Sequence, residues 1–258
     1  MHDHFPAVNH LQDSLGVHFT LLTGQDKALL FDTGYGAEDV ASRIRTMTDL
    51  PLTVVLSHGH HDHAMGCLWF QSVYVHPDDL ETYRTYTSLP WRKSVLQTAK
   101  FKGVAVSDSL FLESPVAKAI PLASKSMDLG GLTVSFLPSP GHTPGSVMAY
   151  IPEQHLLLTG DNWNPVTWCF FPEAMPVQAL LASLRAALDL PFDTVHCSHS
   201  GETYHRQDIV SFLNFCSEDR LRHATPTELG KRFNVDTRMV ETPEGYQLHF
   251  DYHKAFPE

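Results

Sequence analysis

The segment Thr53–Gly66, TVVLSHGHHDHAMG, places four histidines and an aspartate within six positions, directly after the apolar run Val54–Leu56. A short apolar run of this kind is typical of a buried strand. A strand that ends just before a cluster of ring nitrogens and a carboxylate gives these groups a rigid base. The segment therefore predicts a metal site at the end of a strand, and a chance run of histidines on an exposed loop is the alternative.

The pattern within this segment is H-x-H-x-D-H. His58 and His60 are spaced by two, so on an extended or loop backbone their imidazoles can converge on one ion. Asp62 and His63 follow on the turn and can face a second ion. Zinc and similar divalent ions favour imidazole nitrogen supplemented by carboxylate oxygen, so this set of side chains indicates metal binding.

Three later segments carry ligand-type side chains at the ends of predicted strands. PSPGHTPGS contains His142, LLLTGDNW contains Asp161, and TVHCSHSGE contains His199. Loops at one edge of a rigid sheet are where a site is assembled from distant parts of a sequence. We therefore expect one metal pocket that draws on all four segments.

Composition limits the classes of partner and compartment. The chain has 258 residues, 43% of them apolar, and we expect a single compact domain over residues 1–258. The formal charge of −11 repels phosphate backbones, so nucleic acid is not an expected partner.

The start MHDHFPAVNH has no signal-peptide pattern, and no window reaches the ~18 apolar residues of a membrane span. We expect a cytoplasmic protein with a small-molecule substrate and no membrane partner, and a homo-oligomer is left open.

The four cysteines lie far apart and form no C-x-x-C pair. This spacing is typical of reduced thiols in a reducing compartment, and we expect them to serve as small buried side chains.

Strands and helices alternate along the chain. Turn signals and apolar runs predict hairpins over 17–32 and 146–158, a closing hairpin over 238–252, and strands over 53–57, 72–76, 132–137 and 194–197. The 3.6-residue period predicts helices over 37–47, 177–188 and 207–215, and a further helix begins at Pro77.

The segment of about residues 84–118 has no clean period and carries Trp91 and several bases. A long irregular insertion in a compact domain is typical of a lid or binding loop, and a helical interface element is the alternative.

The order H-x-H-x-D-H, G-H-T-P-G, G-D and a late histidine resembles the metallo-β-lactamase-fold hydrolases, with a ligand set like that of glyoxalase II. The resemblance extends from the DTG at Asp32 to His199. It implies an α/β four-layer αββα sandwich with a dinuclear metal site on one edge. Carried over residue by residue, the first metal takes His58, His60 and His142, the second takes Asp62, His63 and His199, and Asp161 bridges both. Asp32 matches the aspartate that orients the histidine loop, and His61 matches a variable position that is not a ligand.

The resemblance also implies a chemistry. Two divalent ions, with zinc favoured and iron or manganese as alternatives, hold a bridging hydroxide that attacks a small ester, thioester or lactone. Asp62 and Asp161 are the candidate catalytic residues, because both offset the charge of the ions and Asp62 can receive a proton. True β-lactamases of this fold lack a bridging aspartate, which argues against that activity. A phosphodiesterase, a di-iron redox protein and a metal-stabilised binding scaffold are the alternatives.

An aromatic stretch, NWNPVTWCFF, follows the predicted bridging aspartate. One interpretation is an apolar pocket wall that positions the substrate, and ordinary core packing beneath the site is the other. The candidate wall residues are Trp163, Asn164, Trp168 and Phe170.

Overall fold

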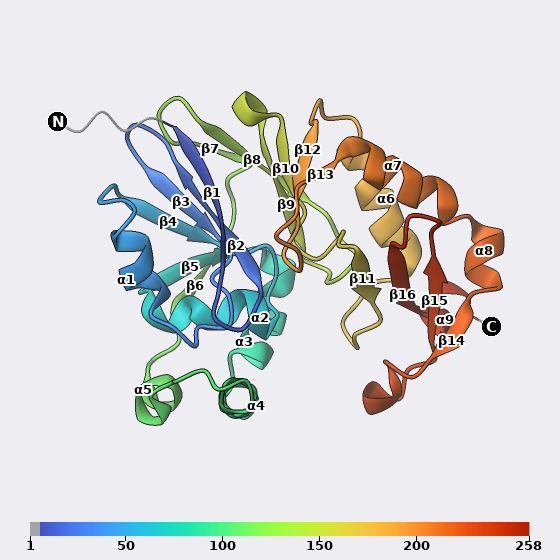
Figure 1. Ribbon diagram of the computed structural model, residues 1–258, viewed down its shortest axis with the longest axis horizontal. Coiled ribbons are helices and arrows are strands. Elements are labelled where there is room, and N and C mark those ends of the chain that lie inside the picture. Colours follow the sequence, from blue (N-terminus) through green and yellow to red (C-terminus); the bar gives the residue numbers. More distant parts are fainter. Residues whose placement is uncertain (1–5, 258) are drawn as a thin grey trace. The chain divides into compact units, whose positions relative to one another are not determined.

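The computed structural model describes residues 6–257 and divides into two compact units, residues 1–136 and 137–258 (Figure 1). Residues 1–5, which belong to the amino-terminal stretch examined for a signal peptide, lie outside the described residues. Among residues 6–257, no helix is long and apolar enough to cross a membrane. Because each unit carries part of the predicted ligand set, each is described in turn.

The first unit contains a mixed sheet with the order β1-β2-β3-β4-β5-β6. Strands β1 to β3 are antiparallel, and β3 to β6 run parallel to one another. The strands are β1 (Ala7–Gln12), β2 (His18–Thr23), β3 (Ala28–Phe31), β4 (Leu52–Val55), β5 (Ser72–Val75) and β6 (Lys118–Pro121). The hairpin predicted over 17–32 is confirmed as β2 and β3, and the run before the histidines is confirmed as β4.

Helices of this unit cover one face of the sheet. Alternate residues such as Leu21, Leu30 and Val54 form a buried cluster with Val40 and Ile44 of α1. The α-helices are α1 (Val40–Arg45), α2 (His61–Ala64), α3 (Leu80–Tyr86), α4 (Leu89–Phe101) and α5 (Asp108–Glu113), and the short 3₁₀ helices are η1 (Met65–Trp69) and η2 (Pro77–Asp79). The buried residues on the covered face of the sheet thus recur at every second position along a strand, as the pleat requires.

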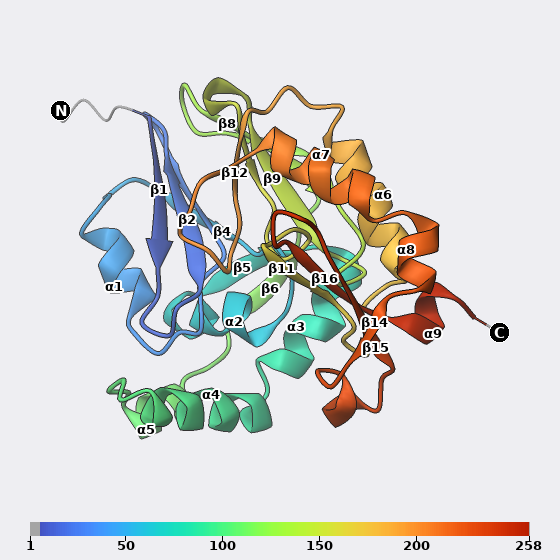
Figure 2. The ribbon, with the colours of Figure 1, turned by 45° about the vertical axis from the view of Figure 1, so that its right-hand side comes forward.

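The segment of residues 84–118 is largely helical, so the expectation of an irregular segment is wrong, while its role as a lid or as an interface element stays a prediction. It contains the end of α3 and helices α4 and α5, which lie side by side in both views (Figures 1 and 2). In α4 the buried residues are Arg92, Val95, Leu96 and Ala99, which have the spacing of one helical face. The period is hidden in the sequence because a charged residue, Arg92, occupies one of the buried positions.

Two further sheets follow. One has the order β13-β12-β10-β9-β8-β7, in which β10 and β12 are parallel. The other has the order β11-β16-β15-β14. Their strands are β7 (Ser126–Asp128), β8 (Thr133–Pro138), β9 (Val147–Ile151), β10 (Leu156–Leu158), β11 (Val166–Cys169), β12 (Thr194–His196), β13 (Tyr204–His205), β14 (Thr225–Thr227), β15 (Thr237–Glu241) and β16 (Gln247–Asp251). Both predicted hairpins in this part of the chain are confirmed, as β9 with β10 and as β15 with β16.

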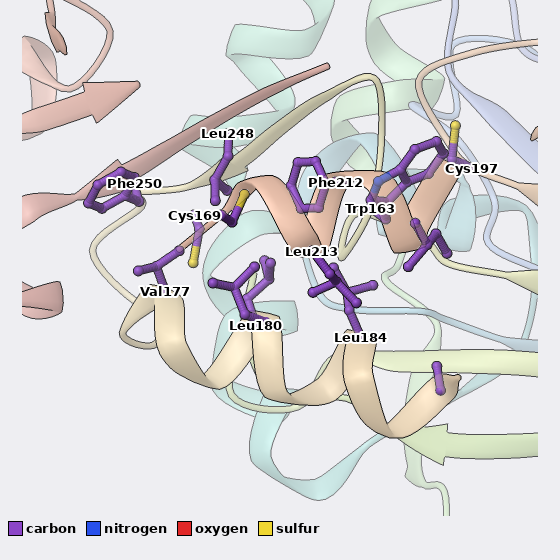
Figure 3. Close-up of a cluster of buried hydrophobic side chains, with 14 of the residues drawn as sticks. Trp163, Cys169, Val177, Leu180, Leu184, Cys197, Phe212, Leu213, Leu248 and Phe250 are labelled. Atoms are coloured by element: carbon purple, nitrogen blue, oxygen red, sulfur yellow. The ribbon is translucent and has the colours of Figure 1, made fainter. Parts of the chain in front are cut away.

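The core of the second unit forms around α6. Its apolar residues Val177, Leu180 and Leu184 recur every three or four positions and contact Phe212 of α7 and Leu248 of β16 (Figure 3). The helices of this unit are α6 (Val177–Ala187), α7 (Arg206–Phe215), α8 (Glu218–Arg222) and α9 (Tyr252–Ala255), with 3₁₀ turns η3 (Pro152–Gln154) and η4 (Lys231–Phe233). This core holds the strands whose ends carry the later predicted ligands.

Candidate metal centre

The histidine loop begins where β4 ends, as the sequence predicted. The ring centroids of His58 and His60 are 4.7 Å apart, and each residue offers a ligand nitrogen within 4.8 Å of the other. Asp62 and His63 lie on the short helix α2, and Asp62 Oδ2 is 3.8 Å from His63 Nε2. The loop therefore presents two pairs of donor atoms, each close enough to share one ion.

Asp32 holds this loop from the neighbouring strand. Because β3 and β4 are parallel, Asp32 at the end of β3 lies beside the start of the loop. Its Oδ1 accepts the Ser57 N–H (2.6 Å), and its Oδ2 accepts the Ser57 hydroxyl (2.7 Å) and His63 Nδ1–H (2.9 Å). The bond at Nδ1 leaves Nε2 of His63 as the nitrogen with the lone pair, which is the atom that a metal would use.

Asp32 has an unusual backbone. Its φ is +68°, in the left-handed region that few residues other than glycine adopt, and its side chain is buried. Aspartate and asparagine tolerate this region better than most residues. The surrounding contacts thus hold a sparsely populated conformation at the point where the carboxylate meets the loop.

A second carboxylate, Asp79, fixes the middle of the loop. Asp79 is completely buried, and its Oδ2 accepts the Gly59 N–H at 2.6 Å. A Cβ at position 59 would lie 2.4 Å from the backbone nitrogen of Tyr83, so the close approach of the loop to α3 requires glycine. The glycine between His58 and His60 is therefore a packing requirement.

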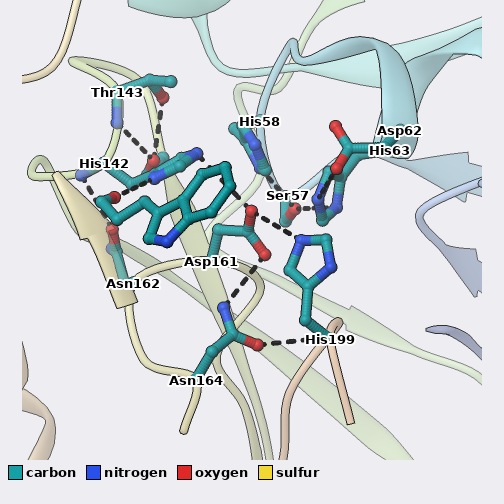
Figure 4. Close-up of polar contacts among 12 residues, drawn as sticks. Ser57, His58, Asp62, His63, His142, Thr143, Asp161, Asn162, Asn164 and His199 are labelled. Atoms are coloured by element: carbon teal, nitrogen blue, oxygen red, sulfur yellow. Dashed lines mark hydrogen bonds and ion pairs between the residues drawn. The ribbon is translucent and has the colours of Figure 1, made fainter. Parts of the chain in front are cut away.

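In the second unit, Asp161 lies between two histidines. Asp161 Oδ2 is 3.0 Å from His199 Nε2 and 3.5 Å from His142 Nε2. Asp161 and His199 follow the parallel strands β10 and β12, whose ends lie at the same edge of the sheet. One carboxylate oxygen thus faces both late histidines (Figure 4).

His142 is oriented through its other nitrogen. Its Nδ1 is 2.6 Å from the carbonyl oxygen of Trp168, and because a carbonyl only accepts, Nδ1 is the donor. The lone pair of the neutral ring is then on Nε2, on the side of Asp161. A backbone carbonyl that fixes the tautomer in this way is the usual support of a metal-binding histidine.

Two asparagines of the same segment hold the histidine loops. Asn162 Oδ1 accepts the backbone N–H of His142 at 3.1 Å, and Asn164 Oδ1 accepts that of His199 at 3.0 Å. Asn164 Nδ2 also donates to Asp161 Oδ1 at 3.2 Å. Asn164 is buried and its amide contacts two of the candidate ligands, while its role in a substrate pocket stays a prediction.

The other candidate pocket residues differ in burial. Trp163 and Phe170 are almost completely buried, and Trp163 belongs to the core cluster around α6. Trp168 is partly buried, and the ring of Phe171 meets His142 edge-on with centroids 5.6 Å apart. The burial of Trp163 and Phe170 favours the core-packing interpretation for these two, whereas Trp168 remains a candidate for contact with substrate.

Helix α4 reaches the histidine loop. The ring centroid of Trp91 is 4.6 Å from that of His61, and Tyr86 of α3 lies 4.5 Å from His60. His61, which was not expected to be a ligand, has ring contacts with Trp91 and Tyr35. The segment of residues 84–118 is thus adjacent to the candidate ligands of its own unit.

The cysteines contribute no ligand to these clusters. Cys67, Cys169, Cys197 and Cys216 are all free and buried, as predicted. Burial raises the pKa of Cys169, Cys197 and Cys216 to about 12. The candidate donor set consists of imidazole nitrogens and carboxylate oxygens, which suits zinc, iron or manganese.

Comparison with known proteins places these clusters in context. The sequence profile described as the metallo-beta-lactamase superfamily matches residues 13–199, a range that includes every candidate ligand. The "Probable metallo-hydrolase YqgX" of Bacillus subtilis (strain 168) is 26% identical over 146 residues, which are 54% of this chain and 63% of the relative. A "Probable metallo-hydrolase" of Streptococcus pyogenes serotype M6 is 23% identical over 159 residues, 61% of this chain and 65% of the relative. The chain spans less than two thirds of the length of these two relatives.

Two solved structures are similar as well. TTHA1623, solved in a di-iron-bound form, is 28% identical with a TM-score of 0.53, and the match covers 78% of this chain and 94% of that one. The metallo-beta-lactamase family protein TTHA1429 of Thermus thermophilus has a TM-score of 0.60 at 18% identity, over 95% of this chain and 98% of that one. At 18% identity, the similarity to TTHA1429 shows the fold alone.

Proposed function

Because the chain belongs to the metallo-β-lactamase superfamily and has its α/β fold, we propose that it is a dinuclear metal-dependent hydrolase of small esters, thioesters or lactones. The family and the fold class expected from the sequence are both confirmed. In the proposed centre, the histidine loop of the first unit and the Asp161 cluster of the second share two divalent ions. The superfamily profile supports this, because it extends over both groups of ligands.

The position of Asp161 is the observation that carries the proposal. Its Oδ2 faces His142 Nε2 and His199 Nε2, which the family assigns to different ions. A carboxylate oxygen shared by two such nitrogens suits a bridge between two cations, whose mutual repulsion it reduces. An aspartate that served only to make a turn after β10 would not need this position.

The donor chemistry fits metal ions. His63 and His142 each use Nδ1 as a donor, to Asp32 and to Trp168 respectively, so that both present Nε2 to the site. Two ions bound here would polarise a substrate carbonyl and lower the pKa of a water molecule toward about 7. We propose zinc as the metal, and the di-iron form of TTHA1623 supports iron as the second candidate.

The chain's own acidic residues complete the proposed chemistry. Asp161 is only 8% exposed, whereas the side chain of His199 is 39% exposed, which supports approach of substrate and water from the side of His199. The side chain of Asp62 is 13% exposed and 3.8 Å from His63 Nε2, which supports a role in which it would accept a proton from water at the ions.

Several features support an acyl substrate. The bridging aspartate departs from the true β-lactamases, and Phe171 and the partly buried Trp168 supply apolar surface near His142. The net charge of −11 disfavours polyanionic substrates such as nucleic acids.

The buried thiols support a reducing, cytoplasmic compartment. The contact of Trp91 with His61 supports a role for residues 84–118 in substrate access.

The test is a panel of chromogenic esters, thioesters, lactones and phosphodiesters with the zinc-loaded chain. We expect metal-dependent acyl hydrolysis that is lost in Asp161→Asn. Asp193→Asn, which changes an exposed carboxylate of the same unit, should retain it. Cleavage of phosphodiesters alone would replace the proposal with the phosphodiesterase alternative. Oxygen consumption by the iron-loaded chain, without turnover of the panel, would replace it with the redox alternative.

A further inference from the structure

The segment Asp161-Asn162-Trp163-Asn164 places one candidate ligand beside two buried amides. Asn162 is 1% exposed and Asn164 is 2% exposed. Each accepts a hydrogen bond from the backbone of one histidine, His142 for Asn162 and His199 for Asn164. The two histidines are 57 residues apart, since 199 − 142 = 57, yet both loops are attached to the same four-residue segment.

Each amide uses both of its ends. Asn162 Nδ2 donates to the carbonyl oxygen of Ser139, which precedes His142 in the same loop. Asn164 Nδ2 donates to Asp161 Oδ1 at 3.2 Å. Only an amide of this length offers a donor and an acceptor side by side, and an apolar replacement would leave a buried backbone N–H without its partner. Both positions therefore require asparagine for the donor and the acceptor of its amide.

The bond from Asn164 also distinguishes the two oxygens of Asp161. Oδ1 accepts the amide, while Oδ2 faces His142 Nε2 and His199 Nε2. A partial rotation of the carboxylate about its Cβ–Cγ bond would break this hydrogen bond and turn the other oxygen away from the two histidine nitrogens. Asn164 thus fixes the orientation of the Asp161 carboxylate, so that one of its oxygens stays between the two histidines.

Trp163 anchors the segment. Its side chain is completely buried, and its ring meets those of Tyr204 and Tyr246 edge-on at 5.0 and 5.4 Å. With the segment fixed in the core, the positions of the two amides are set relative to each other.

We propose that Asn162 and Asn164 are positioning residues that act differently on the two metal sites. Asn162 sets the position of His142 and so the affinity of the first site. Asn164 sets the position of His199, a ligand of the second site only, and the orientation of Asp161, which both sites share, so it acts most strongly on the second site. This inference rests on the proposed dinuclear centre.

The test compares Asn162→Leu and Asn164→Leu, which keep the shape of the side chain and remove both hydrogen bonds. Metal-free chain is titrated with cobalt(II) in competition with a chelator, and occupancy is followed by proton NMR. The Nδ1–H of His142, bound to Trp168 O, reports the first site, and that of His63, bound to Asp32, reports the second. Gln178→Leu is the control, because it removes the hydrogen bond that Gln178 Nε2 donates to Ala255 O in the same unit, and neither residue is a candidate ligand.

We expect Asn162→Leu to weaken the first site by about 10- to 100-fold and Asn164→Leu to weaken the second by a similar factor, as for other residues that support metal ligands. Asn162→Leu should leave the second site at parent affinity. Asn164→Leu should weaken the first site less than the second, because only Asp161 serves both, and Gln178→Leu should leave both sites at parent affinity. If a leucine variant fails to fold, the aspartate variant at that position, which still accepts the histidine N–H, should show a smaller loss at the same site.

Equal weakening of both sites by either variant, or parent affinity in both folded variants, would overturn the inference while leaving the dinuclear centre intact. If the parent chain itself binds no cobalt, the proposed function fails instead. The two failures are distinguished by the titration of the parent.

Discussion

Replacing Asp32 by asparagine should block one metal-binding nitrogen without altering the fold. Asparagine has the same shape and also tolerates a φ of +68°, so the backbone can stay in place. The amide, however, offers one acceptor oxygen where the carboxylate offers two. If that oxygen keeps the Ser57 N–H, the NH₂ group faces the Ser57 hydroxyl and His63 Nδ1.

The consequence for His63 follows from its two nitrogens. Facing a donor, Nδ1 must become the acceptor, and the proton moves to Nε2, the nitrogen presented to the second ion. The loss of a supporting residue of this kind weakens metal binding by about 10- to 100-fold, or about 1.4 to 2.8 kcal/mol. The apo chain should lose only the contribution of a hydrogen bond to a charged group, about 1.5 to 3 kcal/mol.

The assay combines zinc affinity, measured against a fluorescent chelator, with nitrogen NMR of histidine-labelled protein, which distinguishes the two ring tautomers. Asp39→Asn is the matched control, because it removes a carboxylate at the start of α1 where asparagine caps equally well. The reasoning would be refuted if Asp32→Asn bound zinc like the parent, or if its His63 kept the proton on Nδ1.

Asp161→Asn should remain folded, as judged by circular dichroism, and should lose at least one metal ion. Its turnover should fall by more than the factor of about 10 to 100 that is typical of a supporting residue. Full metal content with a normal rate would contradict the bridging role of Asp161. Burial lowers the pKa of His249, so the unfolded chain binds a proton that the folded chain does not. The stability of the metal-free chain should therefore fall as pH drops below about 6.5, and His249→Gln should flatten this dependence in urea unfolding; an unchanged dependence would assign it to other groups. The thiols of Cys169, Cys197 and Cys216, with pKa values raised to about 12, should react with Ellman's reagent only as the chain unfolds, and rapid labelling of folded protein would contradict their burial.

The elements that the sequence predicts well are those with local signals. The apolar run before the histidines, the period of α6 and the turn residues of the hairpins each act within a few positions. Helix α4 escapes detection because Arg92 lies on its buried face. Its guanidinium donates to the carbonyl oxygens of Thr87, Leu112 and Ser114, and these bonds make burial of the charge tolerable.

The residues that hold the site are harder to foresee. The sequence places Asp79 only at the start of a helix, yet its carboxylate binds Gly59, 20 positions earlier. The hydrogen bonds of Asn162 and Asn164 to the histidine loops have no local signal, because the partners of these amides lie 20 and 35 positions away. The candidate metal ligands stand in recognisable sequence motifs, whereas the side chains that support them are defined by tertiary contacts.

The most direct test of the dinuclear proposal is the metal content of the chain after it is freed of metal, reloaded with zinc and dialysed. The proposal predicts about two zinc ions per chain, because Asp161, whose Oδ2 faces both His142 and His199, would be shared by two groups of ligands. Retention of no zinc, with iron and manganese equally absent after the same treatment, would contradict it.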